Sequence, residues 1–250
     1  MPKLQLLFLM GFLSLGIFAQ DFRWSVYPSL GIDMGGAVPF PFSDIPEGAG
    51  GTPKLNPLLG AGFEYNVHPK WNLAMEVNYH NLEFSARAKV ISQSINNGAL
   101  YFSGDTKTDV ELRQIEFPLV VRWKTGENWS LLFGTYYSRI LEGKFVSQGS
   151  NGVLSSNKED TDNAELPGTA DMESSYNWAL DKYDYGLFLG YRYNLNHRLF
   201  FWGRFHAGFK SIFEKDFEVI EYEMYQLRVS VGASYAIFYE NKKQSKQEAK

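Results

Sequence analysis

The chain has 250 residues, a formal net charge of −4 and no cysteine. The mild negative charge argues against a nucleic-acid partner, and the lack of cysteine excludes disulfides and a lipid-anchored N-terminus. Aromatic residues make up 16% of the chain, yet its mean hydropathy is slightly negative. That combination is typical of membrane proteins built from alternating strands, because half of each strand is polar.

The first twenty residues, MPKLQLLFLMGFLSLGIFAQ, have the order of a secretory signal peptide. Lys3 precedes an apolar run over residues 4–18, and the small residue Ala19 follows it. The run is shorter than the roughly 20 residues of a spanning helix, which disfavours a single-pass anchor. We therefore expect residues 1–20 to be a cleaved signal peptide, residues 21–239 to form one domain, and residues 240–250 to be a polar tail in the periplasm.

Period-two alternation and turn signals predict eight strands after the signal peptide. In chain order they are expected at about 24–37, 55–67, 71–89, 107–124, 129–146, 180–195, 199–213 and 222–239. Most exceed the roughly 9–11 residues with which a strand crosses a bilayer. Soluble sandwiches have shorter strands, so the lengths favour a membrane-spanning sheet.

The connections between these strands alternate between short and long. Turns at 66–71, 124–129 and 194–199 are short, whereas the connections at 38–54, 90–106 and 147–178 are long and polar or glycine-rich, and that at 214–221 is brief. A closed meander places all short turns at one end and all loops at the other, as in outer-membrane barrels. The sequence thus predicts an all-β fold, an eight-stranded antiparallel up-and-down transmembrane β-barrel in the cell outer membrane.

Each predicted strand has one apolar and one polar face. The segment WNLAMEVNYH shows the pattern, with Trp71, Met75 and Tyr79 on one face and Glu76 and His80 on the other. An eight-stranded barrel has a lumen only just wide enough for a modest set of side chains, so the many rings cannot all point inward. We therefore expect the apolar face to contact lipid and the polar face, interleaved with glycines, to line the lumen.

Two sets of residues follow from this orientation. Carboxylates and guanidinium groups on the inward face are expected to neutralise one another in a lumen ionic network of Glu64, Glu76, Glu116, Arg122, Arg192, Arg204 and Arg228. Rings at the short-turn end are expected to form an interfacial aromatic girdle of Trp24, Tyr65, Trp71, Trp123, Trp129, Tyr191, Tyr193 and Tyr239.

The segments LRQIEFPLVVRWK (112–124), GAGFEYNV and GLFLGYRYNL, with the FAQ end of the signal, resemble the outer-membrane β-barrel domain family of Bacteroidota, the porin-like or PorT-like group. The resemblance runs from about residue 21 to 239 and implies an outer-membrane location, without a defined activity for most members. Pro118 lies within a predicted strand, where it lacks a ladder donor, so we expect a bulge or local break there. The lysines of the tail could contact anionic headgroups or a partner.

The sequence gives little support for a catalytic site or a metal-binding site. His80 and His206 could face the lumen, and Ser85 or Ser211 could serve them in a lipid hydrolase or acyltransferase, but no diagnostic spacing supports this. The oxygen-rich segment NKEDTDNAE (157–165) lacks the glycine and terminal glutamate of a calcium loop. We expect no catalytic, metal or cofactor site, and hence no enzyme.

The function that fits these features is a structural or interaction role through the external loops, with a lumen filled by side chains. The alternative is a narrow, porin-like channel for small solutes or ions. A lipid hydrolase or acyltransferase built on the barrel is a weaker alternative. Expected partners are outer-membrane lipid and a protein partner that the sequence does not name.

The N-terminal prediction can be checked directly. We expect N-terminal sequencing of the protein purified from outer membranes to begin at Gln20 or Asp21, because the signal peptide is removed during export. Recovery of the protein with residues 1–20 still attached would contradict the signal peptide and favour an anchor.

Overall fold

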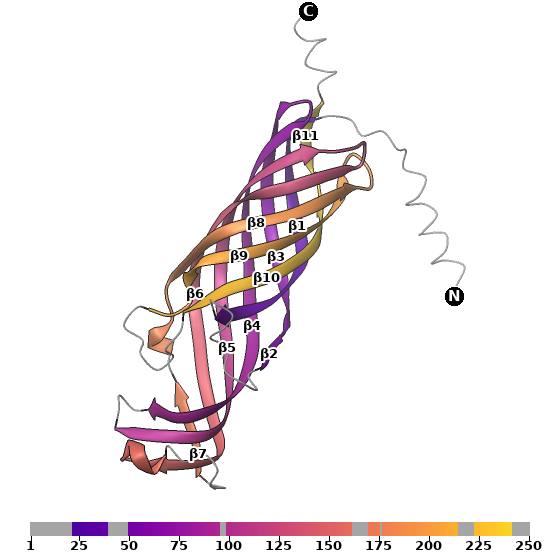
Figure 1. The fold of residues 1–250 in the computed structure, drawn as a ribbon. Coiled ribbons are helices and arrows are strands. Elements are labelled where there is room, and N and C mark those ends of the chain that lie inside the picture. The colour runs from indigo at the N-terminus through magenta and orange to yellow at the C-terminus, as the bar shows by residue number, and fades with distance from the viewer. Residues whose placement is uncertain are drawn as a thin grey trace, which may run out of the picture.

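The structure is a computed structural model that describes residues 22–39, 50–95, 99–161, 170–175, 177–214 and 223–241. The predicted signal peptide and residues 242–250 of the tail lie outside this part. Eight strands form a tilted antiparallel ring (Figure 1), and they are β1 (Phe22–Pro39), β3 (Leu55–His68), β4 (Trp71–Ile95), β5 (Leu100–Lys124), β6 (Trp129–Ser155), β8 (Tyr183–Asn194), β9 (Leu199–Ser211) and β10 (Met224–Tyr235).

Each strand pairs with its neighbour in the chain, and β10 pairs with β1 to close the ring. A short strand, β11 (Phe238–Asn241), continues β10 and also pairs with β1. The two residues between them stay hydrogen-bonded, since Ala236 N donates to Arg198 O and Ile237 N donates to Val26 O. The predicted eight-stranded up-and-down barrel is confirmed, and closure leaves the ring without a free edge in the bilayer.

Side-chain exposure shows which face points outward. Leu119 and Leu189 are 53% and 62% exposed, whereas Glu76 and Arg204 are 7% and 6% exposed. The apolar face is therefore outside and the polar face inside, as predicted. In the part of the chain that the structure describes, no helix is long and apolar enough to cross a membrane, and the helical segments are the short 3₁₀ turns η2 (Lys158–Asp160) and η3 (Asn177–Ala179).

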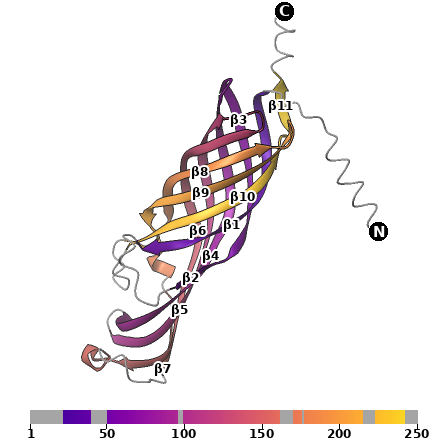
Figure 2. The same ribbon diagram turned by 45° about the vertical axis from the view of Figure 1, so that its right-hand side comes forward.

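Three adjacent strands extend far beyond the ring. β4, β5 and β6 have 25, 25 and 27 residues, and β8 and β9 have only 12 and 13. We call the extension the head, which comprises residues 83–95, 100–111 and 142–155 with β2 (Gly50–Pro53) and β7 (Ala170–Ser175) along its edges. In Figures 1 and 2 the head projects from the end of the barrel that is opposite the end where β11 lies.

The head corrects two sequence expectations. The connection expected at 90–106 is mostly strand, because the ends of β4 and β5 pair with each other as far as Ile95 and Leu100. The start of the connection expected at 147–178 is also strand, since β6 runs to Ser155. Serine, asparagine and glycine favour loops locally, but pairing with two long neighbours overrides that preference.

The tip of the head bends sharply away from the axis of the long strands (Figure 2). Register shifts interrupt β4 between Val90 and Gln93 and β6 between Gly149 and Gly152. Ser92 and Asn151, which lie within these shifts, have φ angles of 48° and 54°. An extra residue in one strand bends it and increases its twist, so these two bulges account for the curled tip.

The outward face changes from apolar to charged along β4. Trp71 to Tyr79 present rings and aliphatic side chains, and Glu83, Arg87 and Lys89 follow at the next outward positions beyond Asn81 and Ser85. This change sets the edge of the lipid-facing band, since nine residues of tilted strand span a hydrocarbon core. The head therefore lies outside the bilayer.

Of the bulge or local break predicted at Pro118, the structure shows the local break. The β4–β5 ladder lacks the pairs opposite Phe117 and Pro118, but the register is the same on both sides of the gap. On its other side Pro118 stays in register with Tyr136 of β6. Proline removes one donor, and a continuous strand accommodates this as a local break in pairing alone.

The lipid-facing assignment predicts a depth-dependent cost of charge. We expect Met75→Arg to lower the free energy of unfolding by about 2–4 kcal/mol, because it places a guanidinium group near the centre of the bilayer. Ile91→Arg is the matched control, since Met75 and Ile91 are 65% and 61% exposed on the same face of β4. Urea unfolding in phospholipid vesicles measures both, and equal costs would contradict the position of the head outside the membrane.

Candidate functional site

The lumen holds the most ordered group of charged side chains, and its first cluster lies near the short turns. Glu64 of β3 accepts hydrogen bonds from Arg192 at 2.7 Å and from Asn72 at 2.7 Å, and it forms an ion pair with Arg122 at 2.8 Å. The Arg192 guanidinium also lies 3.4 Å from the centre of the Phe200 ring. One carboxylate of β3 thus bridges two arginines, one from β5 and one from β8.

A second pair crosses the middle of the lumen. Arg204 of β9 donates two hydrogen bonds, of 2.6 and 2.7 Å, to the carboxylate of Glu76 on β4, and the Tyr27 hydroxyl donates a third at 2.9 Å. The guanidinium lies 4.8 Å from the Trp202 ring and 5.3 Å from the Phe188 ring. The bidentate geometry and the surrounding rings make this a strong, water-excluding tie between opposite walls.

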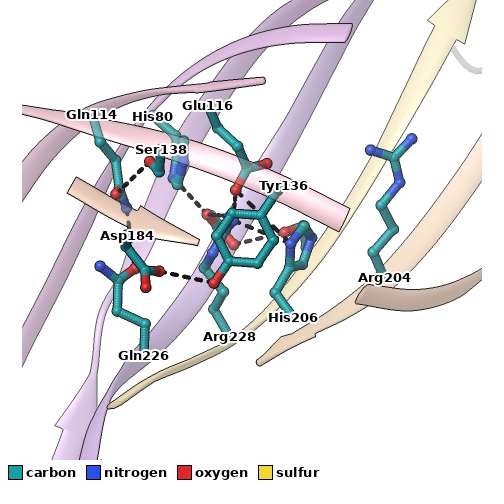
Figure 3. Close-up of polar contacts among 12 residues, drawn as sticks. His80, Gln114, Glu116, Tyr136, Ser138, Asp184, Arg204, His206, Gln226 and Arg228 are labelled. Carbon is teal, nitrogen blue, oxygen red and sulfur yellow. Dashed lines mark hydrogen bonds and ion pairs between the residues drawn. The ribbon is translucent and has the colours of Figure 1, made fainter. Parts of the chain in front are cut away.

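The third cluster is centred on Arg228, which is 2% exposed (Figure 3). Arg228 donates to Asp33 at 2.9 Å and forms an ion pair with Glu116. His80 Nδ1 lies 2.7 Å from Asp33 Oδ2, and His206 Nδ1 lies 3.1 Å from Arg228 Nη2. Side chains from β1, β5 and β9 therefore contact a single guanidinium group of β10, and His80 of β4 joins the cluster through Asp33.

Above this cluster the lumen changes from charged to apolar. A layer of uncharged polar groups comes first, in which Ser138 donates to Gln114 at 2.8 Å and Gln114 donates to Gln226 at 3.4 Å. Beyond it lies an apolar plug at the external mouth, composed of Leu82, Phe84, Val110, Leu112, Ile140, Phe145, Ala179, Leu180, Ile212 and Phe213. In β4 and β5 the plug residues occupy inward positions of strands that carry charges deeper in the barrel, whereas Ala179, Leu180, Ile212 and Phe213 lie just outside β8 and β9.

A small hollow lies on the outer side of the plug, against the concave side of the head. Phe84, Val110, Phe145 and Phe213 form part of its wall, together with small and hydroxyl side chains such as Thr106. Its volume is about 90 Å³, which is room for a few water molecules. The plug thus separates the charged part of the lumen from this external hollow.

The structure brings together all seven residues that were predicted for the lumen network. Glu64 joins Arg122 and Arg192, Glu76 joins Arg204, and Glu116 joins Arg228. The sequence reasoning did not include Asp33, which lies on the polar phase of β1 with Ser25 and Ser29. The position of Asp33 on this polar face is the signal that could have identified it as a lumen residue.

Seven of the eight predicted girdle residues have described side chains, and all seven lie on the outward phase of their strands at the short-turn end. Trp71 stacks on Trp123 with ring centres 5.7 Å apart, and Trp129 contacts Tyr193 at 4.8 Å. The backbone of Tyr239 pairs with Ser25, but its side chain lies outside the described part.

The two serines considered for catalysis do not meet the lumen histidines. The Ser85 hydroxyl donates to Asp109 in the head, and this hydrogen bond together with Lys107 lowers the pKa of the Asp109 carboxyl. Ser211 accepts hydrogen bonds from the backbone of Phe213 and Met224. Among the described residues no three His, Asp or Glu side chains form a metal-binding group, and positions 162–165 of the acidic segment lie outside the described part.

The Glu76–Arg204 pair predicts a characteristic response to substitution. We expect Glu76→Gln to lower the free energy of unfolding by about 3–5 kcal/mol, because it leaves a buried guanidinium group without its counterion. The double variant Glu76→Gln with Arg204→Met removes both charges and should recover most of the loss. Urea unfolding measures the pair, and a double variant as unstable as the single one would show that charge neutralisation is not the cause.

Comparison with known proteins identifies a family with this architecture. Residues 18–214 match the family model described as "Outer membrane protein beta-barrel domain". No curated protein matches the chain.

Similar solved structures include Ail of Yersinia pestis, with 10% identity, a TM-score of 0.39 and coverage of 86% of this chain and 99% of Ail. Neisserial surface protein A has 11% identity, a TM-score of 0.39 and coverage of 86% and 99%. OprG of Pseudomonas aeruginosa has 12% identity, a TM-score of 0.36 and coverage of 87% and 98%.

The family match covers most of the chain and agrees with the closed ring and its outward apolar band. This protein is an outer-membrane β-barrel that belongs to the outer membrane protein beta-barrel domain family.

Proposed function

We propose that the barrel acts as an interaction protein whose head presents a surface outside the cell. The observation that carries this proposal is the extension of β4, β5 and β6 beyond the lipid-facing band as one continuous sheet. Packing at its tip supports a stiff element, since Ile95 and Phe102 are buried and the Ser103 hydroxyl donates to Thr161 O at 2.5 Å. A rigid platform binds a partner with little loss of conformational entropy.

Two exposed cations on the outward face of the head, Arg87 and Lys89, support a partner of opposite sign. Arg87 of β4 lies directly opposite Lys107 of β5, and Lys89 follows two residues on. Lys107 is already neutralised by its 2.9 Å ion pair with Asp109, whereas among the described residues no ion pair engages Arg87 or Lys89. Ile91, which is 61% exposed, adjoins them on the same face. These features favour an acidic protein surface as the partner.

The contents of the lumen favour a structural role for the barrel over a channel. Ion pairs such as Glu76–Arg204 cross its width, and the apolar plug covers its external end. An ion entering this path would have to displace buried charge pairs and rings, which costs several kcal/mol for each pair. A gated path for small ions remains the second candidate, supported by the charged lining.

We infer further that the chain belongs to the porin-like or PorT-like group of Bacteroidota, on the strength of the LRQIEFPLVVRWK segment over 112–124 and the FAQ end of its leader. We also propose cleavage of residues 1–20 on export and a non-enzymatic role, because neither Ser85 nor Ser211 is bonded to a histidine.

Co-purification tests the interaction role. We expect a protein partner to be recovered with the wild-type barrel after mild detergent extraction and to be lost with Arg87→Glu combined with Lys89→Glu, which reverses these two exposed charges of the head. Lys70→Glu, a reversal in the exposed short turn between β3 and β4, is the matched control and should retain the partner. If the head variant folds, as heat-dependent gel mobility reports, and still retains the partner, the head is not the interaction surface.

Conductance distinguishes the second candidate. We expect the wild-type protein to give no single-channel steps in planar bilayers at neutral pH, because the Glu76–Arg204 and Asp33–Arg228 pairs block the lumen. A triple variant with Glu76→Ala, Arg204→Ala and Trp202→Ala should also stay closed, because the Asp33–Arg228 pair and the apolar plug remain in place. Ion-selective steps from the wild-type barrel would favour the channel instead.

A further inference from the structure

The first lumen cluster, near the short turns, has one more positive charge than negative charge. Its carboxylate, Glu64, forms ion pairs with Arg122 at 2.8 Å and with Arg192 at 2.7 Å. Glu64 also accepts a hydrogen bond from Asn72, so both of its oxygens are engaged. Because a guanidinium group is always charged, the two arginines share a single counterion. A surplus of one positive charge therefore remains inside the ring.

The neighbouring charges do not offset this surplus. Glu76, the next carboxylate on β4, accepts two hydrogen bonds from Arg204, and these two charges cancel. The next inward residue of β5 toward the short turns is a further cation, Lys124. The acid of the adjoining turn, Glu127, has an exposed side chain in contact with water. Since an uncompensated charge is unfavourable in a confined space, this end of the lumen attracts an anion.

Buried hydrogen-bond donors lie in the same place. Among the residues that the structure describes, no hydrogen bond engages Arg122 Nε, the Ser130 hydroxyl or the side-chain amide of Asn66. These three residues are only 6%, 2% and 7% exposed. Burying a donor without an acceptor costs free energy, so each of these groups requires an acceptor that the described part of the chain does not supply.

The register of the strands places these groups on one face. Asn66 pairs directly with Asn72, and Asn72 pairs with Arg122. Ser130 pairs with Arg192 and is diagonal to Arg122 in the ladder of β5 and β6. All five residues occupy inward positions of their strands. Because directly paired residues point to the same side of a sheet, their side chains line one continuous arc of the lumen wall from β3 to β8.

We propose that this arc binds a small monovalent anion, such as chloride, at the short-turn end of the lumen. Arg122 and Arg192 supply the surplus charge, and Arg122 Nε, Ser130 and Asn66 supply the free donors. A water molecule can accept these hydrogen bonds but leaves the surplus charge, whereas one monovalent anion removes both deficits. The Glu76–Arg204 pair crosses the lumen above the arc, so the anion enters from the periplasmic end.

Chloride NMR of the folded full-length barrel tests this site. A chloride ion that exchanges between water and a protein site gives a broadened resonance. We expect the wild type to broaden the line in zwitterionic micelles, with gluconate keeping the ionic strength constant. Arg122→Gln should weaken binding about tenfold or more, because it removes the surplus charge and a charge-assisted donor. Ser130→Ala, which removes one neutral donor, should weaken binding about fivefold.

The matched control removes a cation at the same end of the barrel but outside the lumen. Arg198 donates to the hydroxyl of Tyr235, an exposed residue, so Arg198→Gln should leave the chloride broadening unchanged. Heat-dependent gel mobility reports whether each variant is folded. If Arg122→Gln does not fold, Ser130→Ala combined with Asn66→Ala decides, because it keeps every ion pair and should still weaken binding.

Three results would overturn the proposal. The first is a wild-type barrel that does not broaden the chloride line, which would assign the arc to water alone. The second is equal broadening by the wild type and by the folded lumen variants. The third is a loss of broadening with Arg198→Gln as large as with Arg122→Gln, since that would assign chloride to a general attraction at the surface.

Discussion

The structure depends on closing a sheet whose side chains alternate between two incompatible surroundings. Hydrocarbon offers no partner for an open backbone donor or acceptor, so β10 must pair with β1. Once the ring is closed, each position faces either lipid or lumen according to its parity in the strand. Met75 and Glu76 are neighbours in the chain, yet one is 65% exposed and the other 7%. Whether a residue occupies an outward or an inward position of its strand thus decides whether a charged side chain is tolerated there.

Charge inside the ring creates a second requirement, which is neutrality in a confined space. The ion pairs join strands far apart in the sequence, as in Glu76 of β4 with Arg204 of β9, and they tie opposite walls of the barrel. Rings on the same inward face, such as Trp202 beside Arg204, exclude water and strengthen these contacts. Pairs and rings therefore resist flattening of the barrel while they fill its lumen.

The alternation of side chains along each strand made the closed ring and its two faces predictable. It also explains why the rings inside the lumen were not predicted. The inward charges of β4 and β5 could be identified because they alternate with Met75 and Leu119. Tyr27 and Trp202 were not expected inside, because a ring fits there only where the opposing strand has glycine. The Cβ that Gly62 lacks would meet the Tyr27 ring, and the one that Gly232 lacks would meet Trp202. Such complementarity depends on register between strands, which alternation within one strand does not reveal.

The head was missed for a related reason. Its strands contain many serine and glycine residues, and pairing among three long neighbours, not local propensity, holds them extended. Because β8 and β9 end near the bilayer while β4 to β6 continue, the head stands on one sector of the ring (Figure 1). β6 belongs both to the head and to the wall of the ring beside the shorter β8, so the head and the barrel form one continuous sheet.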